Sequence, residues 1–321
     1  MSTDYIIIGQ GIAGSVLAWE LMQRGKKVLV IDPGKNNATK AASGVLNPIT
    51  GRNYVKTWMA DELIPFAVSF YKNIEKELKK SFIKPIPVYK LFYSAGNQND
   101  WSIRAGCADY SSYLQNNEIK HLDKNKVNNN FGAFEINNSY SLNTITFLHS
   151  IKEYLINNNS FSENSLDTGK INFEDNYIKY ENVKAEKIIF CEGYLGKFNK
   201  YFSYLPFNPA KGECLHVRIE NYYNDRIING NYFTMPLGNN EFYLGSTNHW
   251  EFDNELPTEK GKTELTEGLK SLTPLPFTVN NHNAAIRPTV KDRKPLIGLH
   301  SDYPQLAIFN GMGTKGISLA P

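Results

Sequence analysis

The chain has 321 residues, 41% of them hydrophobic and 21% charged, and its formal net charge is +3. These are ordinary values for a globular protein of one large or two smaller domains, and they disfavour a disordered chain or a basic nucleic-acid-binding protein. The three cysteines, Cys107, Cys191 and Cys214, are far apart, and no apolar run approaches the ~18 residues of a membrane span. We therefore expect a cytoplasmic protein with no metal site, no disulfide framework and no membrane span.

The N-terminal residues predict a βαβ unit. Residues 5–8 form an apolar run of the kind found in a strand buried on both faces, and a G-x-G-x-x-G pattern follows at once. The apolar positions of residues 15–24 have helical spacing, and Gly25 ends that helix. A second apolar strand, residues 28–31, leads directly into Asp32. This context makes the glycine pattern indicative of a dinucleotide site.

Each residue of the motif has a physical reason. Gly9 permits the tight turn, Gly11 lets a pyrophosphate approach the backbone, and Gly14 lets the helix pack closely on the strand. The helix N-terminus attracts phosphate, and Asp32 can accept hydrogen bonds from a ribose. The alternative is a unit whose glycines serve only packing. The predicted dinucleotide-binding residues here are Gly9, Gly11, Ile12, Ala13, Gly14 and Asp32. The motif alone leaves NAD and FAD open.

The next part of the chain predicts a mixture of helix, strand and loop. Residues 40–48 are rich in small side chains, so the backbone there could pass close to a bulky ligand. Residues 57–80 predict a long amphipathic helix that Pro65 should kink or divide. Residues 88–93 predict a strand of a second sheet, whereas the polar residues 94–140 predict only loops and short helices.

Residues 141–155 predict a capped helix, and the sequence around Ile171 and Ile178 predicts a hairpin. Residues 185–193 predict a buried strand that ends at Gly193. In a doubly wound sheet, such an end brings backbone to the edge where ligands bind.

From Lys211 onward the sequence predicts an antiparallel sheet. Residues 212–219, 232–235 and 241–245 alternate between apolar and polar positions and are rich in aromatics, which is typical of a wall for a small-molecule site. Residues 258–272 predict a helix, and a final strand at 306–310 runs into a second glycine-rich turn. The candidates for the wall are Tyr232, Phe233 and Tyr243; His216 and His249 could tune an amine, but ordinary sheet positions are favoured for both.

Four stretches together resemble one family. They are residues 9–32, the turn 42–44, residues 285–298 with Arg287 and Asp292, and residues 310–321. The chain resembles the D-amino-acid-oxidase-like family of FAD-dependent oxidoreductases, which includes glycine oxidase and monomeric sarcosine oxidase. Residues 42–48 and 313–316 look most like the oxidoreductase half of the bifunctional enzyme that makes 5-methylaminomethyl-2-thiouridine in tRNA. The resemblance favours FAD over NAD.

The resemblance implies an α/β fold with a Rossmann-like FAD-binding domain, built on a central parallel sheet, and a second domain with a mostly antiparallel sheet. We expect residues 1–84, 141–210 and 284–321 to form the FAD-binding domain. Residues 85–140 and 211–283 would form the substrate domain.

The resemblance also implies cofactor contacts. It places the flavin half of FAD against Ala42, Ser43, Gly44, Gly193, Arg287, Gly311, Gly313, Thr314, Lys315 and Gly316. Lys315 would stabilise negative charge on the reduced flavin, the alternative being a solvent-facing lysine. Residues 284–287 lack the cysteine to which some members attach FAD, so FAD should be noncovalent. The sequence stops at Pro321, where the last helix of the family is only beginning, through truncation or an unusual end.

The implied reaction is oxidation of a small amine or amino acid, such as an N-substituted glycine. Hydride would pass to flavin N5, the imine would be hydrolysed, and oxygen or a quinone-like carrier would accept the electrons. Glycine oxidase has an arginine at the place of Arg287 that holds the substrate carboxylate, and a guanidinium matches a carboxylate physically. The alternative is an arginine paired with Asp292.

Two other functions stay open. One is oxidation of the carboxymethylaminomethyl group of a tRNA wobble uridine, although the methyltransferase half is missing and the small net charge disfavours nucleic acid. The other is a non-catalytic FAD-binding protein.

Overall fold

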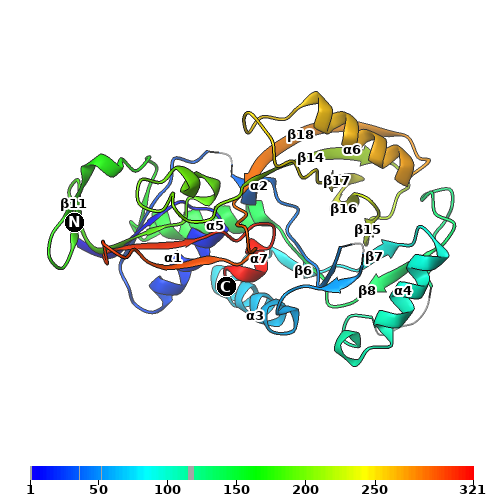
Figure 1. The fold of residues 1–321 in the computed structure, drawn as a ribbon, viewed down its shortest axis with the longest axis horizontal. Helices are drawn as coiled ribbons and strands as arrows, with labels where there is room; N and C mark the ends of the chain where they lie inside the picture. Colours follow the sequence, from blue (N-terminus) through cyan, green and yellow to red (C-terminus); the bar gives the residue numbers. More distant parts are fainter. Residues whose placement is uncertain (1, 36, 52, 115–118) are drawn as a thin grey trace.

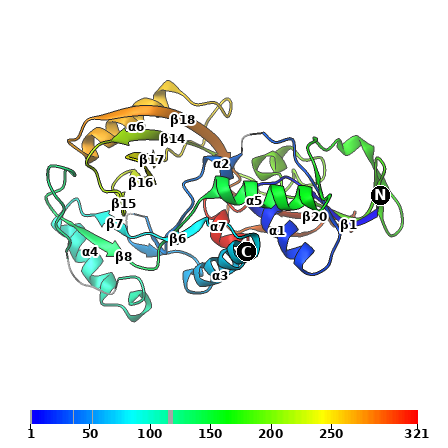
Figure 2. The same cartoon turned by 180° about the vertical axis from the view of Figure 1, so that it is seen from behind.

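The computed structural model describes residues 2–35, 37–51, 53–114 and 119–321. Two sheets lie side by side along the long axis of the molecule (Figures 1 and 2). The short helices α2 (Ala38–Ala41) and α7 (Gly316–Leu319) lie between them. The two-sheet α/β fold expected from the sequence is confirmed.

The first sheet has a parallel centre. Its order is β10 (Phe161–Ser162), β2 (Val28–Ile31), β1 (Ser2–Ile8), β13 (Val183–Phe190), β12 (Ile178–Tyr180) and β11 (Ile171–Phe173), with β20 (Leu306–Asn310) also beside β13 and β19 (Leu296–Leu299) beside β20. The strands β10, β2, β1, β13 and β20 run parallel, whereas β19, β12 and β11 are antiparallel to their neighbours. The predicted hairpin around Ile171 and Ile178 is therefore confirmed.

Strand β1 is buried on both faces, as its unbroken apolar run predicts. Ile7 points into a cluster that includes Phe147, and Ile6 and Ile8 point into a second cluster that includes Phe190. The helices α1 (Ile12–Gln23) and α5 (Thr144–Asn157) contribute to the first cluster. Each buried isoleucine contributes about 1.5–3 kcal/mol, so this strand anchors the turn that follows it.

The second sheet is mostly antiparallel. Its order is β18 (Phe277–Arg287), β14 (Ala210–Ile219), β17 (Glu241–Gly245), β16 (Phe233–Gly238), β15 (Ile227–Asn229), β7 (Val88–Leu91) and β8 (Ala133–Ile136), and only β15 and β7 pair in parallel. The helix α6 (Glu259–Leu272) covers its outer face, where Leu265 and Leu269 are buried with Leu215 and Val217. Both the antiparallel sheet and this helix match the sequence prediction.

The prediction for residues 94–140 is wrong at β8. This strand pairs with β7, and Phe134 within it is fully buried in a cluster of rings with Phe92 and Trp101. The four residues of β8 (Ala133–Ile136) show little strand pattern of their own. Pairing with β7 and packing in the ring cluster determine their conformation. The helix α4 (Ala95–Ala105) is the short helix expected in this region.

The sequence predicts that Pro65 kinks or divides its helix, and the structure shows that it does not divide it. The helix α3 (Ala60–Leu78) continues through Pro65. Proline removes one hydrogen bond, to the carbonyl of Asp61 in the first turn. Pro65 is exposed, so water can satisfy that carbonyl.

Smaller elements connect the two sheets. A three-stranded sheet has the order β3 (Val45–Leu46), β9 (Tyr140–Leu142) and β6 (Ile83–Pro85), and a hairpin joins β4 (Ile49–Thr50) to β5 (Val55–Lys56). The described residues also contain the short 3₁₀ helices η1 (Ala108–Tyr110), η2 (Thr168–Lys170) and η3 (Gly193–Phe198). The division into two domains stays a proposal; β18 crosses the predicted boundary at residue 284.

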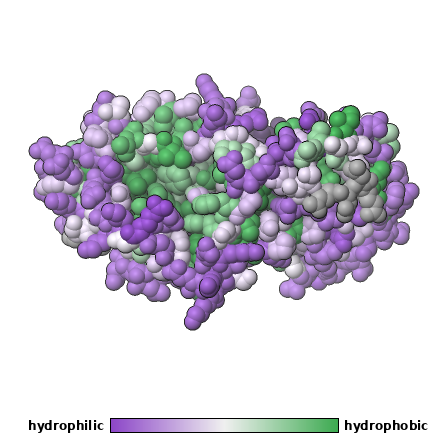
Figure 3. Space-filling model, turned by 90° about the horizontal axis from the view of Figure 1, so that it is seen from below, coloured by the Kyte–Doolittle hydropathy of each residue, from purple (hydrophilic) through white to green (hydrophobic). Residues whose placement is uncertain are grey.

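The surface combines hydrophilic and apolar regions. Seen from below, one face has apolar side chains gathered near its middle with hydrophilic residues around them (Figure 3). Trp58 and Phe66 are among the large hydrophobic residues that stay exposed. Exposed apolar area of this kind is normal in globular proteins. Within the described ranges, no helix is both long and apolar enough to cross a membrane.

We predict that Tyr71→Phe destabilises the fold by about 1 kcal/mol. The buried Tyr71 hydroxyl donates to the Ile317 carbonyl at 2.9 Å and thereby ties α3 to α7. The residue four positions after Ile317 is Pro321, which has no N–H to replace this donor. Urea unfolding measures the change. Tyr154→Phe is the control, and equal stability of Tyr71→Phe and the wild type would contradict the role of this bond.

Candidate cofactor and substrate site

The turn between β1 and α1 requires two of its glycines for steric reasons. Gly9 has a φ of +100°, and a Cβ there would lie 2.6 Å from the carbonyl oxygen of Cys191. A Cβ on Gly14 would lie 1.9 Å from the carbonyl oxygen of Gly9. A Cβ on Gly11 would meet only Thr39 Oγ1 at 3.5 Å, an ordinary contact. The rest of the protein therefore does not require glycine at position 11. The space beside Gly11 is free for a ligand to approach the backbone.

The start of α1 offers free backbone donors. The N–H of Ile12 donates to Thr39 Oγ1 at 3.1 Å, and Gly11 has no side chain to cap the helix. Within the described ranges, the N–H groups of Ala13 and Gly14 have no hydrogen-bond acceptor. Unpaired N–H groups and the helix dipole together attract an anion such as a pyrophosphate.

The carboxylate of Asp32 lies beside this turn. Its Oδ2 accepts a hydrogen bond from the Gln10 N–H at 2.7 Å, and its Oδ1 accepts one from the Gly34 N–H at 2.7 Å. These two bonds fix the carboxylate, and each oxygen keeps acceptor capacity for a hydroxyl group. The structure thus brings together the glycine turn and the acid that the sequence analysis selected.

A cavity of about 1100 Å³ lies between the two sheets. Its lining comes from residues 38–50, from the second sheet and from the turn 312–317. The predicted site residues that line it are Ile12, Ala42, Ser43, Arg287, Gly313, Thr314 and Gly316. Those outside its lining are Gly9, Gly11, Ala13, Gly14, Asp32, Gly44, Gly193, Gly311 and Lys315.

The candidate aromatic residues line the large cavity, whereas the candidate histidines do not. Tyr232, Phe233 and Tyr243 all line the cavity, as the sequence analysis expected of its wall. His216 and His249 do not line it. The rings of Phe233 and Tyr243 stack with centroids 5.5 Å apart, which makes this part of the wall flat and rigid.

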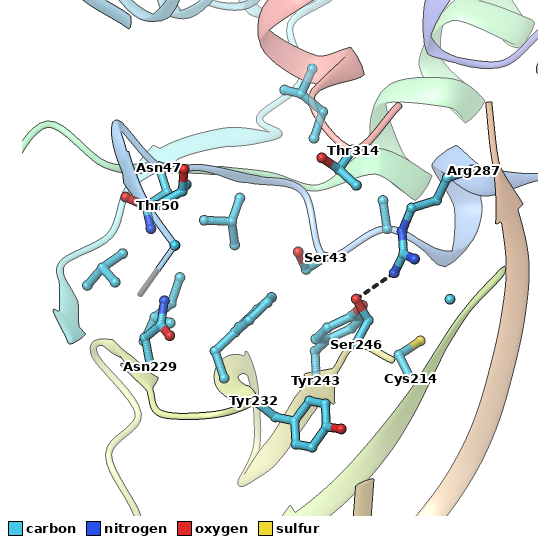
Figure 4. A pocket seen from close by; sticks show the side chains of 18 of the residues that line it. Ser43, Asn47, Thr50, Cys214, Asn229, Tyr232, Tyr243, Ser246, Arg287 and Thr314 are labelled. Carbon is cyan, nitrogen blue, oxygen red and sulfur yellow. Dashed lines mark hydrogen bonds between the residues drawn. The ribbon is translucent and has the colours of Figure 1, made fainter. Parts of the chain in front are cut away.

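Arg287 is a partly buried cation with neutral partners. Its Nη2 donates to Ser246 Oγ at 2.7 Å (Figure 4). Nη2 also donates to the Thr247 carbonyl at 2.9 Å, and Nη1 donates to Asn248 Oδ1 at 3.1 Å. No carboxylate pairs with it in the part of the chain that the structure describes. The alternative partner, Asp292, accepts instead from the Lys294 N–H. Burial lowers the pKa of Arg287, which still remains charged at neutral pH.

Gly212 makes room for this guanidinium. A Cβ at position 212 would lie 2.0 Å from Arg287 Nη2. The side chains on either side of Gly212 form an ion pair of their own, because Lys211 Nζ lies 3.5 Å from Glu213 Oε1. Burial raises the pKa of Glu213, but hydrogen bonds from Thr258 and the charge of Lys211 outweigh this effect and hold the pKa below its usual value. The positive charge of Arg287 therefore remains uncompensated.

The sequence analysis missed these supporting residues. Glu213 N–H donates to Thr247 Oγ1 at 2.9 Å, and Thr247 in turn accepts from Arg287. Charged residues on both sides of a glycine in a strand are a weak signal for such a network. The contacts join residues more than thirty positions apart, which one sequence does not reveal.

Lys315 lies on the other side of the glycine-rich turn. It lines a smaller pocket of about 130 Å³ with Val45, Asn47 and Thr50. Burial lowers the pKa of Lys315, and the nearby charge of Arg293 lowers it further. The half-buried ammonium is thus adjacent to the large cavity but does not line it.

The cavity wall also contains a thiol. Cys214 Sγ lies 3.7 Å from the carbonyl oxygen of Ala41 in the loop that the sequence analysis assigned to a bulky ligand. Burial raises the pKa of Cys214 to about 11, so the thiol is protonated at neutral pH. The described residues contain no group of three or more His, Cys, Asp and Glu side chains that could hold a metal ion.

Comparison with known proteins identifies relatives. Residues 4–321 match the family described as FAD dependent oxidoreductase (DAO). The glycine oxidase of Bacillus licheniformis is 25% identical over 338 residues, which cover 99% of this chain and 90% of that protein. The tRNA 5-methylaminomethyl-2-thiouridine biosynthesis bifunctional protein MnmC of Leptospira borgpetersenii is 23% identical. That match covers 97% of this chain but 54% of MnmC, so the chain spans about half the length of that relative.

Solved structures agree on the fold. Glycine oxidase from Geobacillus kaustophilus has a TM-score of 0.81 at 18% identity, with 100% of this chain and 92% of that chain covered. Iminodiacetate oxidase from Chelativorans sp. BNC1 has a TM-score of 0.79 at 18% identity, with 99% and 92% covered. At these identities the likeness establishes the shared fold alone.

We predict that Asp32→Asn weakens FAD binding about tenfold to a hundredfold. Hydrogen bonds to a charged acceptor contribute roughly 1.5–3 kcal/mol, and the carboxamide also opposes one of the two backbone donors. Titration of the apoprotein with FAD, followed by fluorescence, measures the dissociation constant. Asp4→Asn is the control, because Asp4 Oδ2 likewise accepts a backbone N–H, from Lys27 at 2.7 Å, at the opposite end of β1. Equal FAD affinity of the two variants would contradict the assignment.

Proposed function

The chain belongs to the DAO family of FAD-dependent oxidoreductases, and from this membership we propose that it oxidises the C–N bond of an amine that carries a carboxylate. The substrate would be a small amino acid or an N-substituted glycine. The observation that carries the proposal is the partly buried guanidinium of Arg287, which has hydrogen bonds to neutral groups but no counter-ion in the described chain.

A substrate carboxylate would supply the missing charge. A partly buried ion without a partner loses part of its hydration, and a carboxylate matches the paired N–H groups of a guanidinium. Ser246, Thr247 and Asn248 hold the guanidinium in place before any ligand arrives. Binding would therefore require little reorganisation, and the fixed carboxylate would orient the amine and its α-carbon.

The residues at the β1–α1 turn fit the pyrophosphate and ribose of FAD. We propose that the adenosine diphosphate half is held by Gly9, Gly11, Ile12, Ala13, Gly14 and Asp32. For the flavin half we propose Ala42, Ser43, Gly44, Gly193, Arg287, Gly311, Gly313, Thr314, Lys315 and Gly316. Bound FAD would supply the hydride acceptor for the substrate α C–H bond.

The chain's own contribution would be position and environment. Phe233 and Tyr243 would exclude water from one side of the substrate and favour a neutral amine. No histidine lines the large cavity in the described ranges, which suits a reaction that needs little acid–base catalysis once the amine is neutral. Lys315 would place a half-buried positive charge beside the turn that meets the flavin edge.

We predict that Arg287→Ala lowers kcat/KM for an amino-acid substrate. The loss of transition-state stabilisation should be about 2–5 kcal/mol, much of it from leaving the substrate charge unpaired. Arg287→Lys should recover only part, because the paired donors are lost. Steady-state rates with an amino acid and with the corresponding amine lacking the carboxylate measure the difference.

Two comparisons make this test specific. Arg218→Ala is the control, because Arg218 is an exposed arginine of the same sheet whose Nε donates to Glu220 at 2.7 Å. The amine without a carboxylate should lose little in Arg287→Ala. If both substrates lose equally, Arg287 does not bind the carboxylate and the amino-acid reading loses its main support.

We also predict that FAD is bound noncovalently. Of the three cysteines, only Cys214 lines the large cavity, and its thiol is a poor nucleophile while protonated. Acid precipitation should release the yellow colour into the supernatant. Colour that stays with the pellet would contradict the prediction, and Cys214→Ser would then show whether this thiol forms the bond.

A second candidate function concerns tRNA. The observation in its favour is the match to MnmC over 97% of this chain. The same site chemistry would then act on a carboxymethylaminomethyl group of a wobble uridine. Salt-dependent retention on immobilised tRNA would favour this candidate, and no retention at low salt would count against it.

A further inference from the structure

The large cavity has two polar ends. Figure 4 shows Arg287 and Ser246 at one end, and Asn47 and Thr50 at the other, with Asn229 on the opposite wall of that end. The rest of the lining includes apolar and aromatic residues such as Val45, Ile49, Tyr54, Ile227 and Phe233, and Figure 4 shows Tyr243 and Tyr232 between the two ends. The end with Asn47 and Asn229, called the amide end below, has no role in the proposed function.

The two ends are far apart across the second sheet. Arg287 ends β18, the first strand of that sheet, and Asn229 ends β15, the fifth strand. The guanidinium reaches Ser246 Oγ, 2.7 Å away and just after the third strand, β17 (Glu241–Gly245), so about two strand spacings of 4.8 Å, roughly 10 Å, separate the cation from Asn229 across the sheet. An amino acid spans only about 3.6 Å of chain, so glycine on Arg287 would leave the amide end empty.

The two amides at this end have fixed orientations. Asn47 Oδ1 accepts a hydrogen bond from the Ile49 N–H at 3.0 Å. Asn229 Oδ1 accepts one from Lys90 Nζ at 3.1 Å, and the same ammonium donates to the Gly230 carbonyl at 3.1 Å. Because each carbonyl oxygen is already engaged, the side-chain NH₂ group is the part that can bind a ligand.

Both NH₂ groups lack an internal partner. Within residues 2–35, 37–51, 53–114 and 119–321, no acceptor makes a hydrogen bond with Asn47 Nδ2 or Asn229 Nδ2. Figure 4 places the Thr50 hydroxyl beside Asn47, across the cavity from Asn229. Two amide donors with fixed orientation form a site that prefers an oxygen acceptor over a donor.

We propose that the amide end is a second substrate subsite, which binds a carbonyl or carboxylate oxygen at the far end of an extended substituent on the substrate amine. The substrate class is then an N-substituted glycine with a terminal oxygen acceptor, separated from the amine by an apolar stretch. This inference rests on the proposed function, because it assumes that Arg287 holds the glycine carboxylate.

The test compares N-substituted glycines of increasing length on the FAD-loaded protein. Three series share each chain length: one ends in a carboxylate, one in a methyl ketone and one in a hydrocarbon. At the best length, either acceptor series should exceed the hydrocarbon in kcat/KM by about tenfold. The two acceptor series distinguish a carboxylate from a neutral carbonyl as the preferred group.

Asn229→Asp and Asn47→Asp test the donors directly, because each replaces the NH₂ group by oxygen and keeps Oδ1 for its internal hydrogen bond. Each should raise KM for acceptor-ended substrates about tenfold and change that of N-methylglycine by less than about twofold. Asn254→Asp is the matched control: its Oδ1 accepts the Leu256 N–H at 2.9 Å, and it does not line the cavity.

The outcomes separate the subsite from the proposed function. Equal rates for acceptor and hydrocarbon series, or equal losses for N-methylglycine in the Asp variants, overturn the subsite while the amine oxidase reading stands. If no glycine derivative is oxidised, the proposed function fails. Calorimetric binding of α,ω-dicarboxylates then tests the subsite alone, and unchanged affinity in Asn229→Asp overturns it.

Discussion

The candidate site depends on a partly buried guanidinium whose counter-ion the described chain does not supply. Arg287 lines the large cavity, and its hydrogen bonds go to a hydroxyl, an amide and backbone carbonyls. Neutral acceptors fix its position, but they do not offset the cost of a partly buried charge as an anion would. A site of this kind is stabilised when a carboxylate enters it, which is the physical basis of the proposed substrate class.

The surrounding residues maintain this condition. Gly212 leaves the space that the guanidinium occupies, and the adjacent charges of Lys211 and Glu213 neutralise each other. Glu213 also accepts two hydrogen bonds from Thr258 at the start of α6. The helix, the strand β14 and the arginine are thereby connected, so that changes behind the wall of the cavity should alter the geometry of the cation.

The two sheets contribute different chemistry: the glycine turn and Asp32 lie outside the lining of the large cavity, and of the predicted residues at this turn Ile12 reaches it. The first sheet supplies the glycine turn and Asp32 at the carboxyl ends of its parallel strands, where ligands bind in doubly wound folds. The second sheet supplies an aromatic wall, the guanidinium and the amide end. The loop from Ala38 to Thr50 lies along the cavity and contributes residues to both ends of it.

The local parts of this arrangement are predictable from the sequence, and the long-range parts are not. The burial of Ile6, Ile7 and Ile8 follows from an unbroken apolar run, and the turn at Gly9 and Gly14 follows from glycine spacing. The strand β8 was missed because its pairing with β7 and its ring cluster determine it.

The residues that hold the site in place are far apart in the sequence, so their contacts are not predictable from it. The nearest atoms that a side chain at position 212 would meet belong to Arg287, 75 positions later in the sequence. The need for glycine there is therefore visible only in the folded structure. The same holds for Asn47, which lies between β3 and β4, and Asn229, which ends β15: both line the amide end although they are far apart in the sequence. The roles of the individual cofactor and substrate residues stay proposals.

The most direct measurement is a titration of the FAD-loaded protein with butanoate and with butanamide, followed through the flavin absorption spectrum. The two molecules have nearly the same shape, and neither has an amine to oxidise. If Arg287 lacks a counter-ion until a carboxylate binds, butanoate should bind saturably and butanamide about tenfold or more weakly. Equal affinities would contradict the account, because the site would then not distinguish an anion from a neutral amide.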